Sequence, residues 1–119
     1  LAKVFVVAPS STDERLQKVT NSCSGFVYAA SLMGVTGVRS EISNSAQALV
    51  AKLRNITSLP IAVGLGVSNS EQAAQVSKYA DGVIVGSAFT RHLLENQNID
   101  AALKAITNLA KELSGSMQK

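Results

Sequence analysis

Apolar residues follow two kinds of pattern along the chain. Four short runs rich in Val, Ile and Ala, at residues 3–8, 25–31, 60–64 and 82–85, are nearly continuous, as is typical of strands in a covered parallel sheet. After each run, apolar residues recur every three or four positions, which predicts amphipathic helices. The first run in particular is expected to be buried on both faces. The pattern therefore predicts a strand followed by a helix, repeated four times, with one further helix at the end.

Polar residues mark where the helices are expected to begin. Two stretches match the capping box, in which a Ser is followed three residues later by Glu: Ser11 with Glu14, and Ser68 with Glu71. The helix after Ser68 is expected to reach about residue 79, and the other later helices are expected over residues 43–54, 87–96 and 100–113. Gly115 is the expected stop of the last helix.

The order of these elements predicts an α/β fold with a parallel sheet and right-handed connections. Four βα units make half of an eight-stranded (β/α) barrel, which typically needs about 250 residues. A small open sheet of the flavodoxin type is the alternative. A half-barrel leaves two sheet edges and an apolar inner face uncovered, so we expect it to pair with a second half.

Glycines cluster after three of the predicted strands. Because parallel strands end at the same sheet edge, the loops that carry them are expected to converge there. Backbone amides from such loops, together with the unpaired amides of a helix start, can hold a phosphate group. The alternative is that the glycines only shape tight turns, with Ser87 as a helix cap. The clusters are Gly34 with Gly37, Gly64 with Gly66, and Gly86 with Ser87.

Composition narrows the choice of function. The 119 residues carry a net charge of +3 in scattered positions, with 4% aromatic residues and no Trp, which argues against a stacking surface for single-stranded nucleic acid. The single cysteine, Cys23, excludes a disulfide within the chain and is expected in the core. No stretch is long enough to span a membrane, and we expect a cytoplasmic protein.

Groups for acid–base chemistry are sparse near the expected site. Most of the eight acidic residues lie at helix starts or on helix surfaces, and only Glu41 follows a strand at the functional edge. The single histidine, His92, is expected on a helix surface, and no spacing predicts a metal site. No pair of carboxylates is placed for general acid–base work. The sequence therefore predicts a binding region without catalytic residues of its own.

Three motifs carry a family resemblance. Residues 26–37 read Phe-Val-Tyr-Ala-Ala-Ser-Leu-Met-Gly-Val-Thr-Gly, residues 64–68 read Gly-Leu-Gly-Val-Ser, and residues 84–88 read Ile-Val-Gly-Ser-Ala. In this order and spacing they resemble the C-terminal half of the tryptophan synthase alpha chain family, over essentially all 119 residues.

The resemblance implies a TIM (β/α)8 barrel of which residues 1–119 are the C-terminal half, with the N-terminal half as its partner. It implies a lyase that cleaves indole-3-glycerol phosphate to indole and glyceraldehyde 3-phosphate, without a cofactor of its own. A beta chain carrying pyridoxal phosphate is the second implied partner. The two catalytic carboxylates of the family lie in the N-terminal half, so none is expected here.

The resemblance also implies roles for individual residues. Tyr28 and Ile84 would line the indole pocket, and Thr36 would belong to a mobile loop that closes the site. Leu32 and Leu65 depart from the family pattern, which often has Arg and Phe there. The substrate phosphate would be held by Gly37, Gly64, Gly66, Gly86 and Ser87.

Two other functions remain open from the sequence. One is a different phosphosugar-binding barrel enzyme, such as an isomerase or synthase, which would share the glycine clusters. The other is a non-catalytic half-barrel that binds phosphate or self-associates, because the sequence predicts no catalytic carboxylates and an uncovered inner face.

Overall fold

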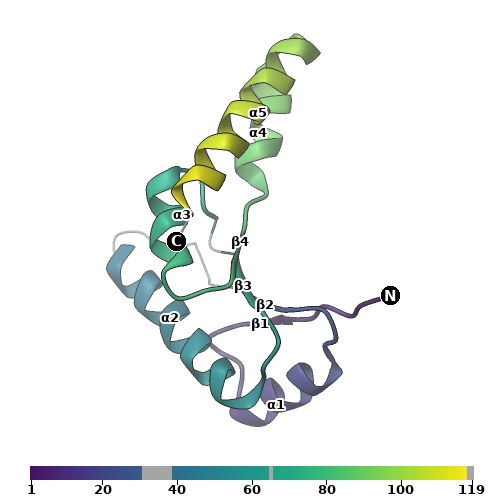
Figure 1. Ribbon diagram of the computed structural model, residues 1–119, viewed down its shortest axis with the longest axis vertical. Coiled ribbons are helices and arrows are strands. Elements are labelled where there is room, and N and C mark those ends of the chain that lie inside the picture. Colours follow the sequence, from purple (N-terminus) through teal and green to yellow (C-terminus); the bar gives the residue numbers. More distant parts are fainter. Residues whose placement is uncertain (31–38, 65, 118–119) are drawn as a thin grey trace.

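A computed structural model of the chain describes residues 1–30, 39–64 and 66–117, and the side chains of residues 45 and onward within the second helix. Its elements alternate as the sequence predicts (Figure 1). In chain order they are β1 (Val6–Val7), α1 (Asp13–Ser22), β2 (Val27–Ala30), α2 (Arg39–Ile56), β3 (Ile61–Gly64), α3 (Ser70–Ser77), β4 (Gly82–Ile84), α4 (Ser87–Glu95) and α5 (Ile99–Ser116).

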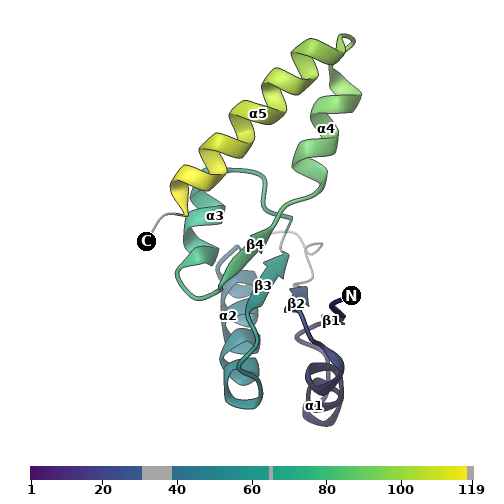
Figure 2. The ribbon, with the colours of Figure 1, turned by 45° about the vertical axis from the view of Figure 1, so that its right-hand side comes forward.

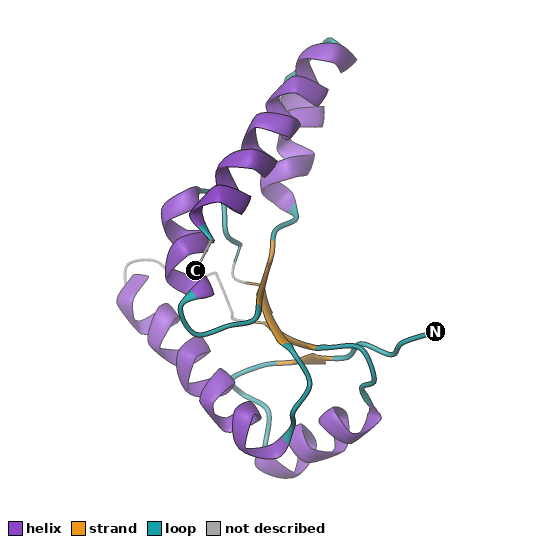
Figure 3. Cartoon of the chain, in the orientation of Figure 1, coloured by secondary structure: helices purple, strands orange, loops and turns teal. Residues whose placement is uncertain are grey.

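The strands form one parallel sheet in the order β1-β2-β3-β4. Helices α1, α2 and α3 lie on one side of this sheet, and α4 and α5 project beyond it (Figure 3). An open doubly wound sheet changes direction in its strand order and carries helices on both faces, whereas a barrel adds its strands in sequence with helices outside. The observed order therefore confirms the half-barrel prediction over the flavodoxin-like alternative.

The hydrophobic core lies between the sheet and these helices. Alternate residues of the central strands point into it, such as Val27 and Ala29 of β2, and Leu53 of α2 meets them there. Cys23 is buried in the same cluster, which confirms its expected packing role. The intervening residues, including Tyr28 and Ala62, are only half-buried and face the other side of the sheet.

The first strand differs from its prediction. Burial on both faces was expected for residues 3–8, but only Val6 and Val7 form strand, and only Val7 is buried. Phe5 is 45% exposed and Val6 57% exposed. The physical reason is position: β1 is a sheet edge, and Val6 pairs with Tyr28 on the face that no described helix covers.

The two predicted capping boxes are each wrong by one residue. Helix α1 is capped by Thr12, whose side chain accepts from the Arg15 amide, while the Ser11 hydroxyl accepts from the Ala8 amide. Helix α3 is capped by Asn69, which accepts from the Gln72 amide. Two neighbouring polar residues can each serve as a cap, and the turn before the helix decides between them.

Other helix ends also differ from the pattern. Helix α5 begins one residue early, because Asn98 caps it, and it continues through Gly115 to Ser116, so Gly115 is not its stop. Helix α2 begins at Arg39, ahead of the expected start at residue 43, and it ends at Ile56. Residues 31–38, which precede it, lie outside the described residues.

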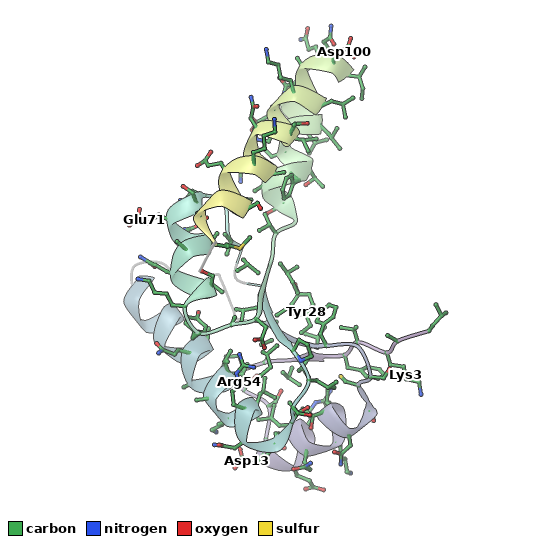
Figure 4. All side chains as sticks on the ribbon, in the orientation of Figure 1. Lys3, Asp13, Tyr28, Arg54, Glu71 and Asp100 are labelled. Atoms are coloured by element: carbon green, nitrogen blue, oxygen red, sulfur yellow. The ribbon has the colours of Figure 1, made fainter. Side chains whose placement is uncertain are left out.

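An ion pair joins Arg54 of α2, labelled in Figure 4, to Asp81, the residue directly before β4 at the amino-terminal end of the sheet. The Arg54 guanidinium donates to Asp81 at 2.6 Å and to the Tyr79 carbonyl at 3.4 Å. Asp81 also accepts from the Ile61 amide at 2.9 Å, so one carboxylate links a helix and two strands. The two side chains are 43% and 39% exposed, which limits the value of the ion pair itself.

Replacing Asp81 with Ala is expected to lower the free energy of unfolding by about 1–2 kcal/mol, because the part-buried Ile61 amide loses its side-chain acceptor. Chemical denaturation measures this change. Lys52→Met is the matched control. Lys52 lies on α2, as Arg54 does, but its ion pair with Asp13 is an exposed 3.4 Å contact. Its expected cost is below about 0.5 kcal/mol, and equal losses in both variants would contradict this role for Asp81.

Candidate functional site

The carboxyl ends of three strands meet in one row. Ala30, Gly64 and Ile84 are register partners across β2, β3 and β4. Two of the expected site residues, Gly64 and Ile84, therefore lie side by side, and the segments that follow both strands start from this edge (Figure 2). Gly37 and Thr36, which were expected here too, lie outside the described residues, as do Leu32 and Leu65.

Gly66 lies just beyond β3 and adopts a conformation that favours glycine. Its φ is 65°, the one positive value recorded in the described chain. Gly66 is also exposed, so its backbone borders solvent at this edge of the sheet. A side chain here would strain the turn, which gives Gly66 a structural role in addition to any contact with a ligand.

Helix α4 begins at the same edge without a side-chain cap. Gly86 occupies its N-cap position and makes no side-chain hydrogen bond, so Ser87 is the first helical residue and not the cap. Helices α1, α3 and α5 are all capped by side chains, from Thr12, Asn69 and Asn98. The alternative of a plain turn with Ser87 as the helix cap is therefore wrong about the capping residue, because Gly86 occupies the N-cap position.

Amides at this helix start are open to an anion. The first amides to bond back to the Gly86 carbonyl are those of Phe89, at 2.9 Å, and Thr90, at 3.3 Å. Those of Ser87 and Ala88 come before them, and no side chain in the described chain caps the helix. Gly86 is exposed, and a Cβ built on it would meet nothing within 4 Å. Unpaired amides and the helix dipole together favour a phosphate here.

Tyr28 and Gly64 are in close contact on the inner face. A Cβ built on Gly64 would lie 2.5 Å from the Tyr28 hydroxyl oxygen and 2.9 Å from two ring carbons. Tyr28 lies on the side of the sheet away from α2 (Figure 4), where its ring extends over the end of β3. The structure thus brings together a residue expected at the indole pocket and one expected at the phosphate.

Carboxylate and imidazole side chains are absent from this edge in the part of the chain that the structure describes. Asp81 is bound to Arg54 at the opposite end of the sheet, and His92 is half-buried on α4. The other described acidic residues are exposed on helices, and the side chain of Glu41 is not described. Among the described residues, no cluster of His, Cys, Asp or Glu could hold a metal ion, and no helix is long and apolar enough to cross a membrane.

Two features of the edge were missed in the sequence. Ala62 is the register partner of Tyr28 on one side and of Gly82 on the other, so the inner face has small residues next to Tyr28 in the sheet. Period-two alternation counted from Tyr28 could have found them. The Ala88 amide was also missed, because its availability depends on which residue caps α4, and Gly86 directly before Ser87 was the available signal.

A sequential parallel sheet with outer helices defines the chain as part of a (β/α)8 barrel. The family model described as "Tryptophan synthase alpha chain" matches residues 1–118. The chain belongs to the tryptophan synthase alpha chain family.

Relatives and solved structures agree with this assignment. The chain is 58% identical over 114 residues to the tryptophan synthase alpha chain of Streptomyces avermitilis, covering 96% of this chain and 41% of the relative. It is 53% identical to that of Acidothermus cellulolyticus, covering all of this chain and 44% of the relative. The chain therefore spans less than half the length of these curated relatives.

Among solved structures, tryptophan synthase of M. tuberculosis in space group F222 matches with a TM-score of 0.83 and 44% identity, over all of this chain and 43% of that chain. A structure of the tryptophan synthase a2b2 complex from Pyrococcus furiosus matches with a TM-score of 0.81 and 36% identity, over 97% of this chain and 46% of that chain. These neighbours are TIM barrels, and the chain corresponds to their C-terminal half.

Proposed function

We propose that this chain is the substrate-phosphate-binding part of a tryptophan synthase alpha subunit. The complete subunit is a lyase of tryptophan biosynthesis that cleaves indole-3-glycerol phosphate to indole and glyceraldehyde 3-phosphate. The family match over residues 1–118 carries this proposal. The open amides at the start of α4, beside the carboxyl ends of β3 and β4, support the phosphate role.

In this proposal, the site residues that the structure describes have separate tasks. The amides of Ser87 and Ala88 donate to the phosphate oxygens, the Ser87 hydroxyl adds a hydrogen bond, and the Gly64 and Gly66 backbone borders the same group. Binding the phosphate at a fixed point orients the rest of the substrate across the inner face. Tyr28 and Ile84 flank the indole there, on the two sides of the small residues of β3.

Partners supply what this chain does not. The N-terminal half of the barrel provides the carboxylates that protonate the indole and promote the retro-aldol cleavage. Gly37 and the loop residue Thr36 complete the site from the segment before α2. A beta chain with its own pyridoxal phosphate receives the indole, in a cytoplasmic complex. The named assembly of the Pyrococcus furiosus relative supports the beta chain as partner.

Cleavage of indole-3-glycerol phosphate tests the proposal. The protein for this test is the joined barrel, in which the part of the Streptomyces avermitilis relative that this chain does not span precedes residues 1–119. Indole release well above that of the unjoined pieces is the expected result. A folded joined barrel that releases no indole but converts another phosphosugar would favour the other barrel enzyme. If the joined barrel turns over neither substrate, the non-catalytic half-barrel that binds phosphate is the function that stays open.

Replacing Ser87 with Ala in the joined barrel is expected to weaken binding of glycerol 3-phosphate by about 1 kcal/mol, close to fivefold, because one hydroxyl donor is lost while the backbone amides stay. Isothermal titration calorimetry measures the change. Ser114→Ala is the control, since Ser114 is exposed on α5, far along the chain from the strand ends. A loss of about 100-fold would show that the hydroxyl, and not the backbone amides, dominates binding.

A further inference from the structure

The turn between β3 and α3 leaves the carboxyl edge of the sheet at Gly66. Gly66 is exposed and has a φ of 65°. Val67, the next residue, is 2% exposed and belongs to the hydrophobic core. Ser68 is exposed again, directly before the cap of α3. One buried side chain fixes a single point of a turn, so the contacts of Ser68 decide how rigidly this turn is held.

The side chain of Gln72, in the first turn of α3, binds Ser68. Its carbonyl oxygen accepts from the Ser68 amide at 2.9 Å and from the Ser68 hydroxyl at 3.2 Å. A backbone amide can only donate, so the oxygen of the Gln72 side chain, and not its NH2 group, must face Ser68. The Gln72 backbone amide donates to the Asn69 side chain at 2.9 Å. Gln72 is therefore bonded to the segment before it through both its side chain and its backbone.

This arrangement differs from the usual capping box. In that motif, the side chain at the third helical position accepts from the amide of the cap residue, which closes the start of the helix on itself. Gln72 is the third helical residue of α3, but its side chain accepts from Ser68, the residue before the Asn69 cap. The bond therefore attaches the preceding turn to the helix.

Helix α3 is a firm support for this attachment. Ala73, directly after Gln72, is 0% exposed, and Val76 is 4% exposed. Both belong to the hydrophobic core, and the helix packs on β4 and α5. Because the core is closely packed, the start of α3 cannot shift without disturbing it. The Gln72 side chain thus fixes the Gly66 turn relative to the core.

The attached turn starts next to the open start of α4. Gly64 and Ile84 are register partners at the carboxyl edge of the sheet, and Gly66 and Gly86 follow them at the same spacing along their own segments. The two segments therefore leave the sheet from adjacent positions. A phosphate held by the α4 amides would border the Gly66 turn, so the position of this turn bears on binding.

We propose that Gln72 is a positioning residue for the substrate phosphate. Its side chain does not touch the ligand. By holding Ser68, it keeps the Gly66 turn in one conformation before the ligand arrives, so that binding does not have to order the turn. This inference rests on the proposed function for the identity of the ligand.

Removing the acceptor oxygen in the joined barrel tests this role. Gln72→Met keeps the length of the side chain but not its carbonyl oxygen, whereas Gln72→Glu keeps an acceptor oxygen. Gln75→Met is the matched control, because Gln75 is exposed about one turn later on the same helix. Hydrogen exchange of the Ser68 amide, followed by NMR, reports on the turn. Calorimetry with glycerol 3-phosphate reports on binding, and thermal unfolding checks the fold.

In Gln72→Met, the Ser68 amide is expected to exchange at least about fivefold faster, and the affinity for glycerol 3-phosphate to fall about three- to fivefold, because binding must then order the turn. Gln72→Glu should keep the slow exchange, and Gln75→Met should change neither measurement. Unchanged exchange, or faster exchange with unchanged affinity, would overturn the proposal. Faster exchange with weaker binding, in a barrel that releases no indole, would support the role of Gln72 and refute only the cleavage reaction.

Discussion

Replacing Gly86 with Val is expected to weaken binding of glycerol 3-phosphate to the joined barrel by about 100-fold. A side chain at the α4 N-cap stands in front of the Ser87 and Ala88 amides, and losing two hydrogen bonds to a charged group costs about 3 kcal/mol. The fold should tolerate the change, because a Cβ at Gly86 meets nothing within 4 Å in the described chain. Isothermal titration calorimetry gives the affinity, and thermal unfolding checks the fold.

Gly115 offers a matched control for this substitution. It is also exposed, and a Cβ built on it also meets nothing within 4 Å, but it lies near the end of α5. Gly115→Val should leave the affinity for glycerol 3-phosphate unchanged. Unchanged affinity in Gly86→Val, with the barrel folded, would refute the anion site at α4.

Replacing Gly64 with Ala is expected to lower the free energy of unfolding by about 1–3 kcal/mol, because the added methyl group overlaps the Tyr28 ring and hydroxyl. The ring must move away from the end of β3, so substrate affinity should fall as well. Denaturant unfolding of the joined barrel measures the stability, and calorimetry measures the affinity.

Gly82→Ala is the control for Gly64→Ala, since its added Cβ would lie at an ordinary 3.5 Å from the Ala62 Cβ. The double variant Tyr28→Ala with Gly64→Ala tests the contact itself. If the overlap causes the loss, Gly64→Ala should cost little stability once Tyr28 is truncated. The same cost in both backgrounds would show that Tyr28 is not the cause.

Sheet architecture was predictable because it depends on a pattern that repeats. Four apolar runs, each followed by helical periodicity, leave few topologies once connections must be right-handed. The details that were predicted wrongly, burial and helix capping, depend on neighbouring residues and elements. Valine is a residue type typical of buried strands, but Val6 can be buried only if another element packs on the inner face of the sheet. Thr12 and Asn69 are the caps in place of the adjacent serines, whose hydroxyls are bonded elsewhere: Ser11 accepts from the Ala8 amide, and Ser68 donates to the Gln72 side chain.

The candidate site was likewise predictable only in part. Glycines after successive strands could be placed at one edge from the sequence alone, because parallel strands share their direction. The contact of Tyr28 with Gly64 could not, since it depends on the register of β2 against β3 and on the rotamer of the ring. The open start of α4 depends on a single choice of cap, Gly86 or Ser87, for which propensity favours Ser.

The backbone amides at the start of α4 are proposed to hold the substrate phosphate. Amide chemical shifts of the joined barrel, followed by NMR during a titration with glycerol 3-phosphate, report on these amides one by one. We expect the Ser87 and Ala88 amides to shift and to saturate together. The Gln72 amide, already bonded to the Asn69 cap of α3, should not move. Saturable binding that leaves the Ser87 and Ala88 amides unmoved would refute a phosphate site at the start of α4.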